Sequence, residues 1–574
     1  MKIVCLVKQV PRTDAIAFDQ DTKSLKREGV PLLLNMFDAG AVAQAAALKE
    51  QHGAEVIALT MGPPQSEAAL RACFALGADR AIHLSDRAFA LADTLGTSRT
   101  LALAIQKEGD VDLVIAGVKT TDSETWQVPP ETAAFLGWPH LTSIVDIARA
   151  DGRIRATRET EQGTQTYELD GPAVLSIAHA LAAAEEEDGE ITVWTANDLV
   201  DDLREHDQRF GQTGSPTRVL AVRDVTPERV RFRTDDLAAA ASRVGELLAE
   251  RKEQNTHWDK PERLGEKPGK SYDSWTLVEA VDGRPTRTSL ELLAKGRELS
   301  GKLGGDNVAL VLGRNLGDLA AGLGRRGADR VVVVDDERLD RYQPNVWAAA
   351  LAEVVRHHRP HVLAIPATAN GRDLGPRVAG ELELGMTGDC VNLGIDRAGR
   401  LIQTKPAYGG NIASVIMGRT TPQLATVRPR MFDVLEERDA EAEIERFVVE
   451  DLPEPVARLV DESPAPAQDL DEADMVVLLG PDAPAGLDTG KAAVGGTRER
   501  DDLPGNRRIG VNGRAVAPDI LVALGVPGDF EQTTGVVKST VIVAVGCGQD
   551  FAQVSDVIFD GDATQLLAAL DDIS

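Results

Sequence analysis

The sequence predicts an α/β protein with two duplicated parallel-sheet domains and a third, smaller α/β domain. Short apolar runs of strand length alternate with helical patterns through most of the 574 residues, which is typical of parallel βαβ units. Residues 77–80 (GADR) recur as residues 327–330, and each copy is followed by an apolar, strand-like run. Residues 111–117 (VDLVIAG) have a counterpart in residues 361–367 (HVLAIPA) at the same displacement. Because separate elements share one displacement, we infer an internal duplication.

Shifts in composition set the expected domain boundaries. The two related domains are expected at residues 1–205 and 272–455, and the polar stretch 206–271 between them is expected to be an arm and linker. A second break, dense in Pro, Asp and Glu, covers residues 452–471. The third domain is expected at residues 473–574, where several strand candidates end in glycine. Glycine there indicates either a ligand close to the backbone or an ordinary turn.

The net charge of the chain limits the classes of partner that it can bind. The chain has 62 Lys and Arg against 91 Asp and Glu, which gives a formal net charge of −29. So acidic a surface disfavours a nucleic-acid partner and an anionic membrane surface. There is no apolar run of about 18 residues, and the chain begins directly with a strand-like segment, so we expect no membrane insertion and a cytoplasmic location. The four cysteines lie far apart and predict neither disulfides nor a zinc site.

Several familiar binding and catalytic motifs are absent or incomplete. No Gly-x-Gly-x-x-Gly follows a predicted strand, and residues 486–492 resemble a P-loop that is one residue short and lacks the magnesium-binding Ser or Thr. A helix is expected to end near His357, His358 and His361. Because the C-terminus of a helix favours positively charged side chains, no metal is needed to explain this group of histidines. The sequence therefore predicts no metal ligands and no catalytic residues.

One segment between a buried strand and a helix has the pattern of an anion site. Residues 117–133 place Pro129 and Pro130 where a helix tolerates missing N–H groups, its first turn. The remaining N–H groups, with Thr125 or Thr132, would form a pocket suited to a phosphate. A simple capped helix is the alternative. The second domain repeats this layout at residues 368–377, where we expect the two arginines to pair with carboxylates rather than to bind phosphate.

The segments that carry the most specific pattern resemble a known family. They are 7–11 (VKQVP), 35–38 (NMFD), 62–65 (GPPQ), 92–95 (ADTL), 122–131 and 214–217 (GSPT) in the first half, and 371–374 (GRDL), 387–390 (TGDC), 405–411 (KPAYGGN) and 422–429 (PQLATVRP) in the second half. The chain resembles the electron-transfer flavoproteins, with the β subunit fused ahead of the α subunit. The resemblance implies two adenine-nucleotide alpha-hydrolase-like domains followed by an FAD-binding domain.

The resemblance implies an adenine nucleotide in the first half. The residues carried over to that pocket are Leu6, Asn35, Met61, Asp122, Thr125, Gln127, Val128 and Thr132. Residues 127–131 are more similar to the branch of the family whose β half holds a second FAD and reacts with NADH. The ligand expected here is therefore AMP or a second FAD.

The resemblance implies FAD in the third domain, between that domain and the first half, with Phe37 as an aromatic neighbour. The residues carried over are Arg498, Gly510, Val511, Asn512, Gly513, Gly528, Gln532 and Asp556. Pro527 and Gln532 replace a serine and a histidine of the family, which removes hydrogen-bond donors near the flavin. The alternative is that Arg498 pairs with Asp501 or Asp502 and that no flavin binds.

The function implied is that of a single-chain electron carrier rather than a substrate-converting enzyme. It would take electrons from a flavin-dependent dehydrogenase and pass them through FAD to a quinone reductase or another redox acceptor. Two alternatives remain at this stage. One is a variant that oxidises NADH at an FAD in the first half, and the other is a non-redox scaffold that binds an adenine nucleotide.

Overall fold

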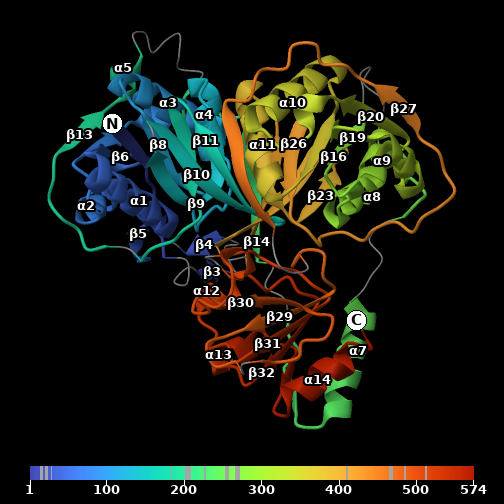
Figure 1. The fold of residues 1–574 in the computed structure, drawn as a ribbon. Coiled ribbons are helices and arrows are strands. Elements are labelled where there is room, and N and C mark those ends of the chain that lie inside the picture. Colours follow the sequence, from blue (N-terminus) through green and yellow to red (C-terminus); the bar gives the residue numbers. More distant parts are fainter. Residues whose placement is uncertain are drawn as a thin grey trace.

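The computed structural model describes residues 1–12, 17–19, 24–26, 29–150, 152–182, 184–200, 209–224, 228–251, 257–264, 272–408, 412–464, 469–483, 486–510 and 513–573. Two α/β lobes lie side by side, and a third unit lies below them (Figure 1). The first lobe is blue to teal, the second is green to orange, and the third unit is mostly red. In the described residues no helix is both long enough and apolar enough to cross a membrane.

The first lobe is built on a ten-stranded sheet in the order β13-β7-β6-β1-β8-β12-β9-β10-β11-β28. The parallel strands are rich in Val, Ile, Leu and Ala and buried, because helices cover both faces of such a sheet. The strands are β1 (Lys2–Leu6), β6 (Glu55–Met61), β7 (Arg80–Leu84), β8 (Leu113–Gly117), β9 (His140–Ala150), β10 (Arg153–Thr160), β11 (Gly163–Leu169), β12 (Ala173–Ile177), β13 (Ile191–Trp194) and β28 (Ala457–Pro464).

Helices and small hairpins complete the first lobe. The α-helices are α1 (Met36–His52), α2 (Glu67–Ala75), α3 (Thr94–Glu108), α4 (Val128–Leu136) and α5 (Ala196–Leu199). Two small hairpins pair β2 (Gln9–Pro11) with β5 (Leu32–Leu34) and β3 (Ala17–Asp19) with β4 (Ser24–Lys26). Helix α1 ends at Gly53, whose φ of 67° is in the left-handed region that glycine adopts without strain.

The second lobe repeats the parallel core of the first. Its order β20-β19-β16-β21-β26 matches β7-β6-β1-β8-β12, so the predicted duplication is confirmed at the level of topology. The strands are β16 (Ser274–Val278), β17 (Ala280–Val281), β18 (Arg284–Pro285), β19 (Asn307–Gly313), β20 (Arg330–Asp335), β21 (Val362–Pro366), β22 (Met386–Cys390), β23 (Asn392–Ile395), β24 (Leu401–Ala407), β25 (Ile412–Gly418), β26 (Gln423–Val427) and β27 (Glu443–Arg446). The helices are α8 (Arg287–Leu303), α9 (Gly317–Gly322), α10 (Pro344–His358) and α11 (Ala369–Glu381).

The two lobes contact each other through equivalent helices. Helix α4 follows β8 and helix α11 follows β21, and the two helices pack together. The approach is close, because a Cβ added at Gly380 would lie 2.7 Å from the Cβ of Ala134. The closest approach is therefore between the C-terminal half of α4 and the last turn of α11, at the junction of the lobes.

The third unit is a six-stranded parallel sheet in the order β15-β33-β32-β31-β29-β30. The strands are β15 (Phe232–Thr234), β29 (Met475–Leu479), β30 (Ala493–Gly496), β31 (Ile520–Leu524), β32 (Val541–Val545) and β33 (Val557–Phe559). The helices are α7 (Leu237–Arg251), α12 (Phe530–Thr533), α13 (Gln549–Gln553) and α14 (Ala563–Leu570). An apolar cluster joins this sheet to α7 and α14.

The stretches predicted as linkers contain more structure than expected. Within 206–271, β14 (Thr217–Asp224) pairs with β25 of the second lobe, and β15 with α7 belongs to the third unit. Within the predicted break at 452–471, β28 pairs with β11 and forms an edge of the first sheet. These strands lie at sheet edges and their partners are far away in sequence, so local composition does not reveal them.

Candidate functional site

The strand order of the first lobe reverses between β1 and β8, where parallel sheets offer a crevice for ligands. Part of this crevice is filled by Asp38 from the first turn of α1. Its carboxylate accepts hydrogen bonds from the N–H groups of Lys8 (2.8 Å) and Gly117 (3.1 Å), which joins the ends of the two strands. Burial raises the pKa of Asp38 to about 7. The Asp38 carboxylate thus fills the end of the crevice that lies at α1.

Two predicted residues hold the loop that leads from β8 to α4. The side-chain amide of Asn35 donates to the carbonyl of Lys119 at 2.9 Å. Asp122 accepts a hydrogen bond from the Lys8 ammonium at 2.6 Å and another from the Thr120 hydroxyl at 2.6 Å. Burial opposes ionisation of Asp122, yet the Lys8 charge keeps the pKa of Asp122 below its ordinary value. The loop is therefore fixed before any ligand arrives.

The first turn of α4 has donors without partners. The Thr132 hydroxyl is fully buried and has no hydrogen-bond partner in the described structure. Gln127 and Val128 donate no backbone hydrogen bond within the described chain, and Pro129 and Pro130 have no N–H. Free N–H groups at a helix N-terminus suit one phosphate group, and the orphan hydroxyl of Thr132 lies one turn further along the helix. The residues present therefore fit the phosphate end of a nucleotide.

The other predicted residues of this pocket lie around the same crevice. Leu6 and Met61 are the last residues of the neighbouring strands β1 and β6. Phe37, predicted instead as an aromatic neighbour of FAD, is buried beside this loop, with the Lys119 ammonium 5.5 Å from the centre of its ring. The side-chain amide of Gln127 donates to the carbonyl of Met386 at 3.1 Å, so it contacts the second lobe rather than open space.

A buried network of charges at the lobe junction was not predicted as a site. Arg428 bonds Glu124 of the first lobe at 2.9 Å and Asp389 of the second lobe at 3.1 Å. Arg372 forms two bonds to Asp389, at 2.9 and 3.0 Å, which confirms its predicted pairing with a carboxylate. Lys405 donates to the carbonyl of Glu124 at 2.8 Å, and burial lowers its pKa to about 8. The charged residues within the motifs 387–390, 405–411 and 422–429 were the available signal.

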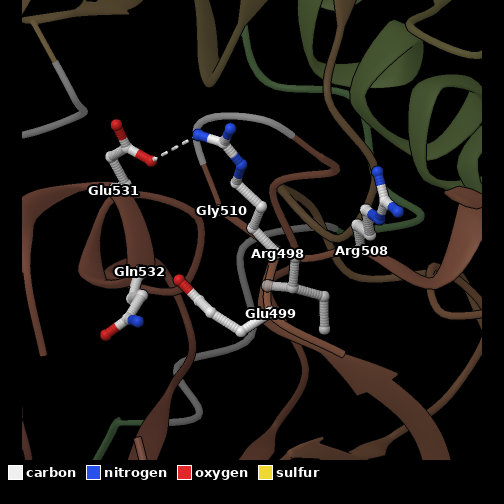
Figure 2. A pocket seen from close by; sticks show the side chains of 7 residues that line it. Arg498, Glu499, Arg508, Gly510, Glu531 and Gln532 are labelled. Atoms are coloured by element: carbon white, nitrogen blue, oxygen red, sulfur yellow. Dashed lines mark ion pairs between the residues drawn. The ribbon is translucent and has the colours of Figure 1, made fainter. Parts of the chain in front are cut away.

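A pocket in the third unit includes three of the residues predicted to bind FAD (Figure 2). Its lining is Arg498, Glu499, Arg508, Ile509, Gly510, Glu531 and Gln532. The pocket lies beyond Gly496, the last residue of β30, at the carboxyl edge of the parallel sheet. This is the edge where open α/β sheets bind ligands.

The partner of Arg498 differs from the alternative prediction. Its guanidinium lies 3.9 Å from the carboxylate of Glu531, and both side chains are nearly half exposed. Asp501 lies 3.9 Å from Arg508, and Asp502 pairs with Arg500 at 2.7 Å. Because exposed ion pairs are weak, Arg498 keeps a positive charge available to a ligand.

Buried donors beside this pocket lack partners. The hydroxyl of Thr497 and the Nε atom of Arg508 are buried without a hydrogen bond in the described chain. Both belong to segments that form the pocket wall. Donors of this kind, together with the positive charge of Arg498, suit the carbonyl groups and the reduced, anionic form of an isoalloxazine. These side chains could contribute charge and hydrogen bonds to a flavin, and the space that the pocket encloses in this structure is smaller than an isoalloxazine ring.

The two lobes also match a known family. The model described as "Electron transfer flavoprotein domain" matches residues 22–199 and 274–452, which correspond to the first and second lobes. This chain belongs to the electron transfer flavoprotein family.

Relatives of this electron transfer flavoprotein each cover about half of it. The electron transfer flavoprotein subunit alpha of Clostridium acetobutylicum is 32% identical over 319 residues, 52% of this chain and 95% of that subunit. Protein FixA of Azorhizobium caulinodans is 39% identical over 242 residues, 39% of this chain and 84% of FixA. The caffeyl-CoA reductase-Etf complex subunit CarD of Acetobacterium woodii is 39% identical over 233 residues, 38% of this chain and 86% of CarD. A β-like half and an α-like half are thus joined in one chain.

Several residues carried over to the predicted FAD pocket make contacts within the third unit. The Gln532 amide oxygen accepts a bond from the N–H of Gly528 at 2.7 Å, so these two residues hold their own loop. A Cβ at Gly510 would lie 2.5 Å from the carbonyl of Glu531, and one at Gly513 would lie 2.2 Å from the carbonyl of Arg508. Glycine is required here by contacts between loops. Val511 and Asn512 lie outside the described residues.

Asp556 is not part of the pocket. It precedes β33 and lies beside the start of β32, at the amino edge of the sheet, opposite to the edge that carries Arg498. Its carboxylate is buried and pairs with Arg229 at 2.7 Å and with Arg251 at 2.9 Å. The prediction that Asp556 contacts FAD is therefore corrected: this residue anchors the segment 229–251 to the third unit.

The side of the third unit that carries the pocket lies against the first lobe. A Cβ added at Gly505 would lie 2.1 Å from the carboxylate of Glu159 in β10. Partial burial and the nearby charges of Arg508 and Arg498 lower the pKa of His179, which follows β12. Both observations place the wall of the pocket against the first lobe.

Proposed function

We propose that this electron transfer flavoprotein is a single-chain electron carrier, with FAD in the third-unit pocket and an adenine nucleotide in the first-lobe crevice. The observation that carries the proposal is the available Arg498 charge beside the unpartnered donors of Thr497 and Arg508. Bound FAD would supply reversible one- and two-electron chemistry. The chain would supply its position, its electrostatic environment and contacts with redox partners.

Each pocket residue has a distinct part in this proposal. Arg498 would favour the negatively charged, reduced form of the ring, because a positive charge nearby stabilises that form. Glu499 and Glu531 line the same pocket and oppose that effect. With these two carboxylates the net charge of the pocket is close to zero. The reduction potential of the flavin would therefore be lower than beside Arg498 alone.

The partners are proposed to be redox proteins. Two relatives have names that connect them with acyl-CoA chemistry, the CarD subunit and the acryloyl-CoA reductase electron transfer subunit beta of Anaerotignum propionicum. We therefore propose that the donor is a flavin-dependent dehydrogenase and that the acceptor is a quinone reductase or another redox protein. A cytoplasmic location is part of the same proposal.

The test is a comparison of flavin binding in the full chain and in two variants. The purified or FAD-reconstituted chain is expected to show flavin absorption bands with about one FAD in the third unit. Arg498→Ala is expected to lower the midpoint potential and to weaken FAD binding roughly tenfold, since a lost charge-assisted bond costs about 1.5–3 kcal/mol. Arg233→Ala, an exposed arginine of β15, is the matched control. A chain that takes up no FAD, or an Arg498→Ala variant with unchanged affinity and potential, contradicts the proposal.

A further inference from the structure

Residues 257–264 lie on the second lobe, although they belong to the stretch that joins the two halves of the chain. The ring N–H of Trp258 donates to the carbonyl of Glu436 at 2.8 Å, and the Arg297 guanidinium donates to the carbonyl of Trp258 at 2.7 Å. The guanidinium carbon of Arg297 also lies 5.1 Å from the centre of the Trp258 ring, where a cation is attracted to the aromatic face. Trp258 therefore anchors the start of this segment.

Two further contacts hold the rest of the segment. The Lys260 ammonium pairs with the Asp329 carboxylate and donates to the carbonyl of Gly305 at 3.1 Å. At the end of the segment, the N–H of Leu264 donates at 2.9 Å to the carbonyl of Lys302, in the last turn of α8. The segment is therefore docked on the second lobe at its start, in its middle and at its end.

Three connections join the described parts of the lobes to the third unit, through residues 225–227, 252–256 and 465–468. The first and the last start from β14 and β28, which belong to sheets of the lobes. The middle connection starts from α7, which packs against the third-unit sheet, and leads to residues 257–264. In Figure 1, β14 lies between the lobes and the third unit, whereas α7 lies at the right side of that unit. Two attachments leave rotation about the line that joins them, so a third attachment at another side opposes this rotation.

Docking of residues 257–264 decides how short the middle connection is. Arg251, the last residue of α7, pairs with the buried Asp556 of the third unit at 2.9 Å. Between Arg251 and His257 the chain can span at most about 20 Å, because an extended chain covers about 3.3–3.6 Å per residue. Without docking, the first residue held on the second lobe would be Ser274 at the start of β16, and the span would rise to about 80 Å. Docking therefore shortens the possible span about fourfold.

We propose that residues 257–264 are a strap that limits the rotation of the third unit relative to the two lobes. The surface that binds the strap is on the second lobe, at α8 and the loops beside it, and its occupant is this segment of the same chain. Units joined by polar connections move relative to each other unless a contact prevents it. The strap therefore limits how far the third unit can turn away from the first lobe, with or without a bound flavin.

The first experiment compares one insertion at two places in the full chain. Spin labels at Ala249→Cys in α7 and Asp318→Cys in α9, both exposed, report the distance between the third unit and the second lobe. Cys547→Ser removes the half-buried cysteine, and the other three are buried. A Gly-Ser insertion of about fifteen residues within 252–256 adds about 50 Å of possible span and is expected to broaden the distance distribution. The same insertion within 265–271 lies beyond the strap and is expected to leave the distribution unchanged. Equal distributions in the two chains, or broadening by the second insertion alone, overturn the proposal.

The second experiment releases the strap without changing the length of the chain. Replacing both anchors, Trp258→Ala with Lys260→Ala, is expected to speed hydrogen exchange in 257–264 and to broaden the same distance distribution. Glu262→Ala, a change at an exposed residue of the strap, is the matched control and is expected to change neither. Faster exchange without a broader distribution shows that the strap does not limit the third unit and overturns the proposal. Unchanged exchange in the double variant shows that these two residues are not the anchors and also contradicts it.

Discussion

The carboxylate of Glu161 accepts a hydrogen bond from the N–H of Ala369 at 2.9 Å. Glu161 follows β10 of the first lobe, and Ala369 begins α11 of the second lobe. Helix α11 is the counterpart of α4, so the first lobe places a carboxylate where the duplicated helix could accept an anion. The duplicated site is occupied by the protein itself, whereas the turn of α4 keeps its donors free.

Removing this contact is expected to weaken the docking of the lobes. Glu161→Ala leaves the buried N–H of Ala369 without a partner and is expected to lower the free energy of unfolding by about 1–3 kcal/mol. Glu161→Gln retains an acceptor and is expected to lose less. Urea denaturation of the full chain measures both changes. A Glu161→Ala variant as stable as the wild-type chain would show that the contact contributes nothing.

Asp556 is expected to control the attachment of α7. Replacing it with Ala leaves the positive charges of Arg229 and Arg251 without their buried partner, and breaking such a pair typically costs about 3–5 kcal/mol. Hydrogen exchange in residues 228–251 is expected to become faster, while FAD binding at the opposite edge of the sheet is retained. Asp560→Asn removes only an exposed pair with Arg233 and serves as the control. If the Asp556→Ala variant loses FAD while hydrogen exchange in residues 228–251 is unchanged, Asp556 contacts the flavin instead.

Stability is expected to fall as the pH rises from about 5 to 8, in part because of Glu279. Burial, with the nearby charge of Glu161, raises the pKa of Glu279 from 4.5 to about 8. Between these values the folded chain binds a proton that the unfolded chain has released, so the free energy of unfolding decreases with rising pH. The Glu279 contribution is complete below pH 4.5 and is lost as the pH passes 8.

The Glu279→Gln variant isolates this effect from other buried acids. The glutamine cannot ionise and can still accept a bond from Thr368, which donates to Glu279 at 2.8 Å. The difference in unfolding free energy between wild-type and variant chains is therefore expected to change with pH between 5 and 8. A constant difference across this range would contradict the raised pKa.

The segment 257–264 is expected to depend on Trp258 for its position on the second lobe. The guanidinium carbons of Arg297 and Arg438 lie 5.1 and 5.2 Å from the centre of the Trp258 ring, and the ring N–H donates to the carbonyl of Glu436 at 2.8 Å. Trp258→Ala is expected to speed hydrogen exchange in 257–264 and to cost about 1–2 kcal/mol. Trp258→Phe should retain part of the effect. Unchanged exchange in Trp258→Ala would show that other contacts hold the segment.

The parts of the fold that local sequence patterns control were predictable. Buried strands such as β8 and β21 are short, apolar and repeated, and the prolines at 129 and 130 marked the first turn of α4. The role of Asp556 was not predictable from its surroundings in the sequence, because Arg229 and Arg251 lie some three hundred positions earlier. The role of a glycine is equally hard to predict from sequence. Glycine is needed both where a ligand approaches the backbone and where two loops contact each other, so its presence does not distinguish the two cases.

The edge strand β28 has a consequence for the synthesis of this protein. Residues 457–464 pair with β11, although every other strand of that sheet precedes residue 195. The ribosome must therefore make the whole second lobe before the first sheet receives its last strand. Domains generally fold as units in order of synthesis, so β11 would wait with an open edge until then. A nascent chain released early would retain that edge and be prone to aggregate.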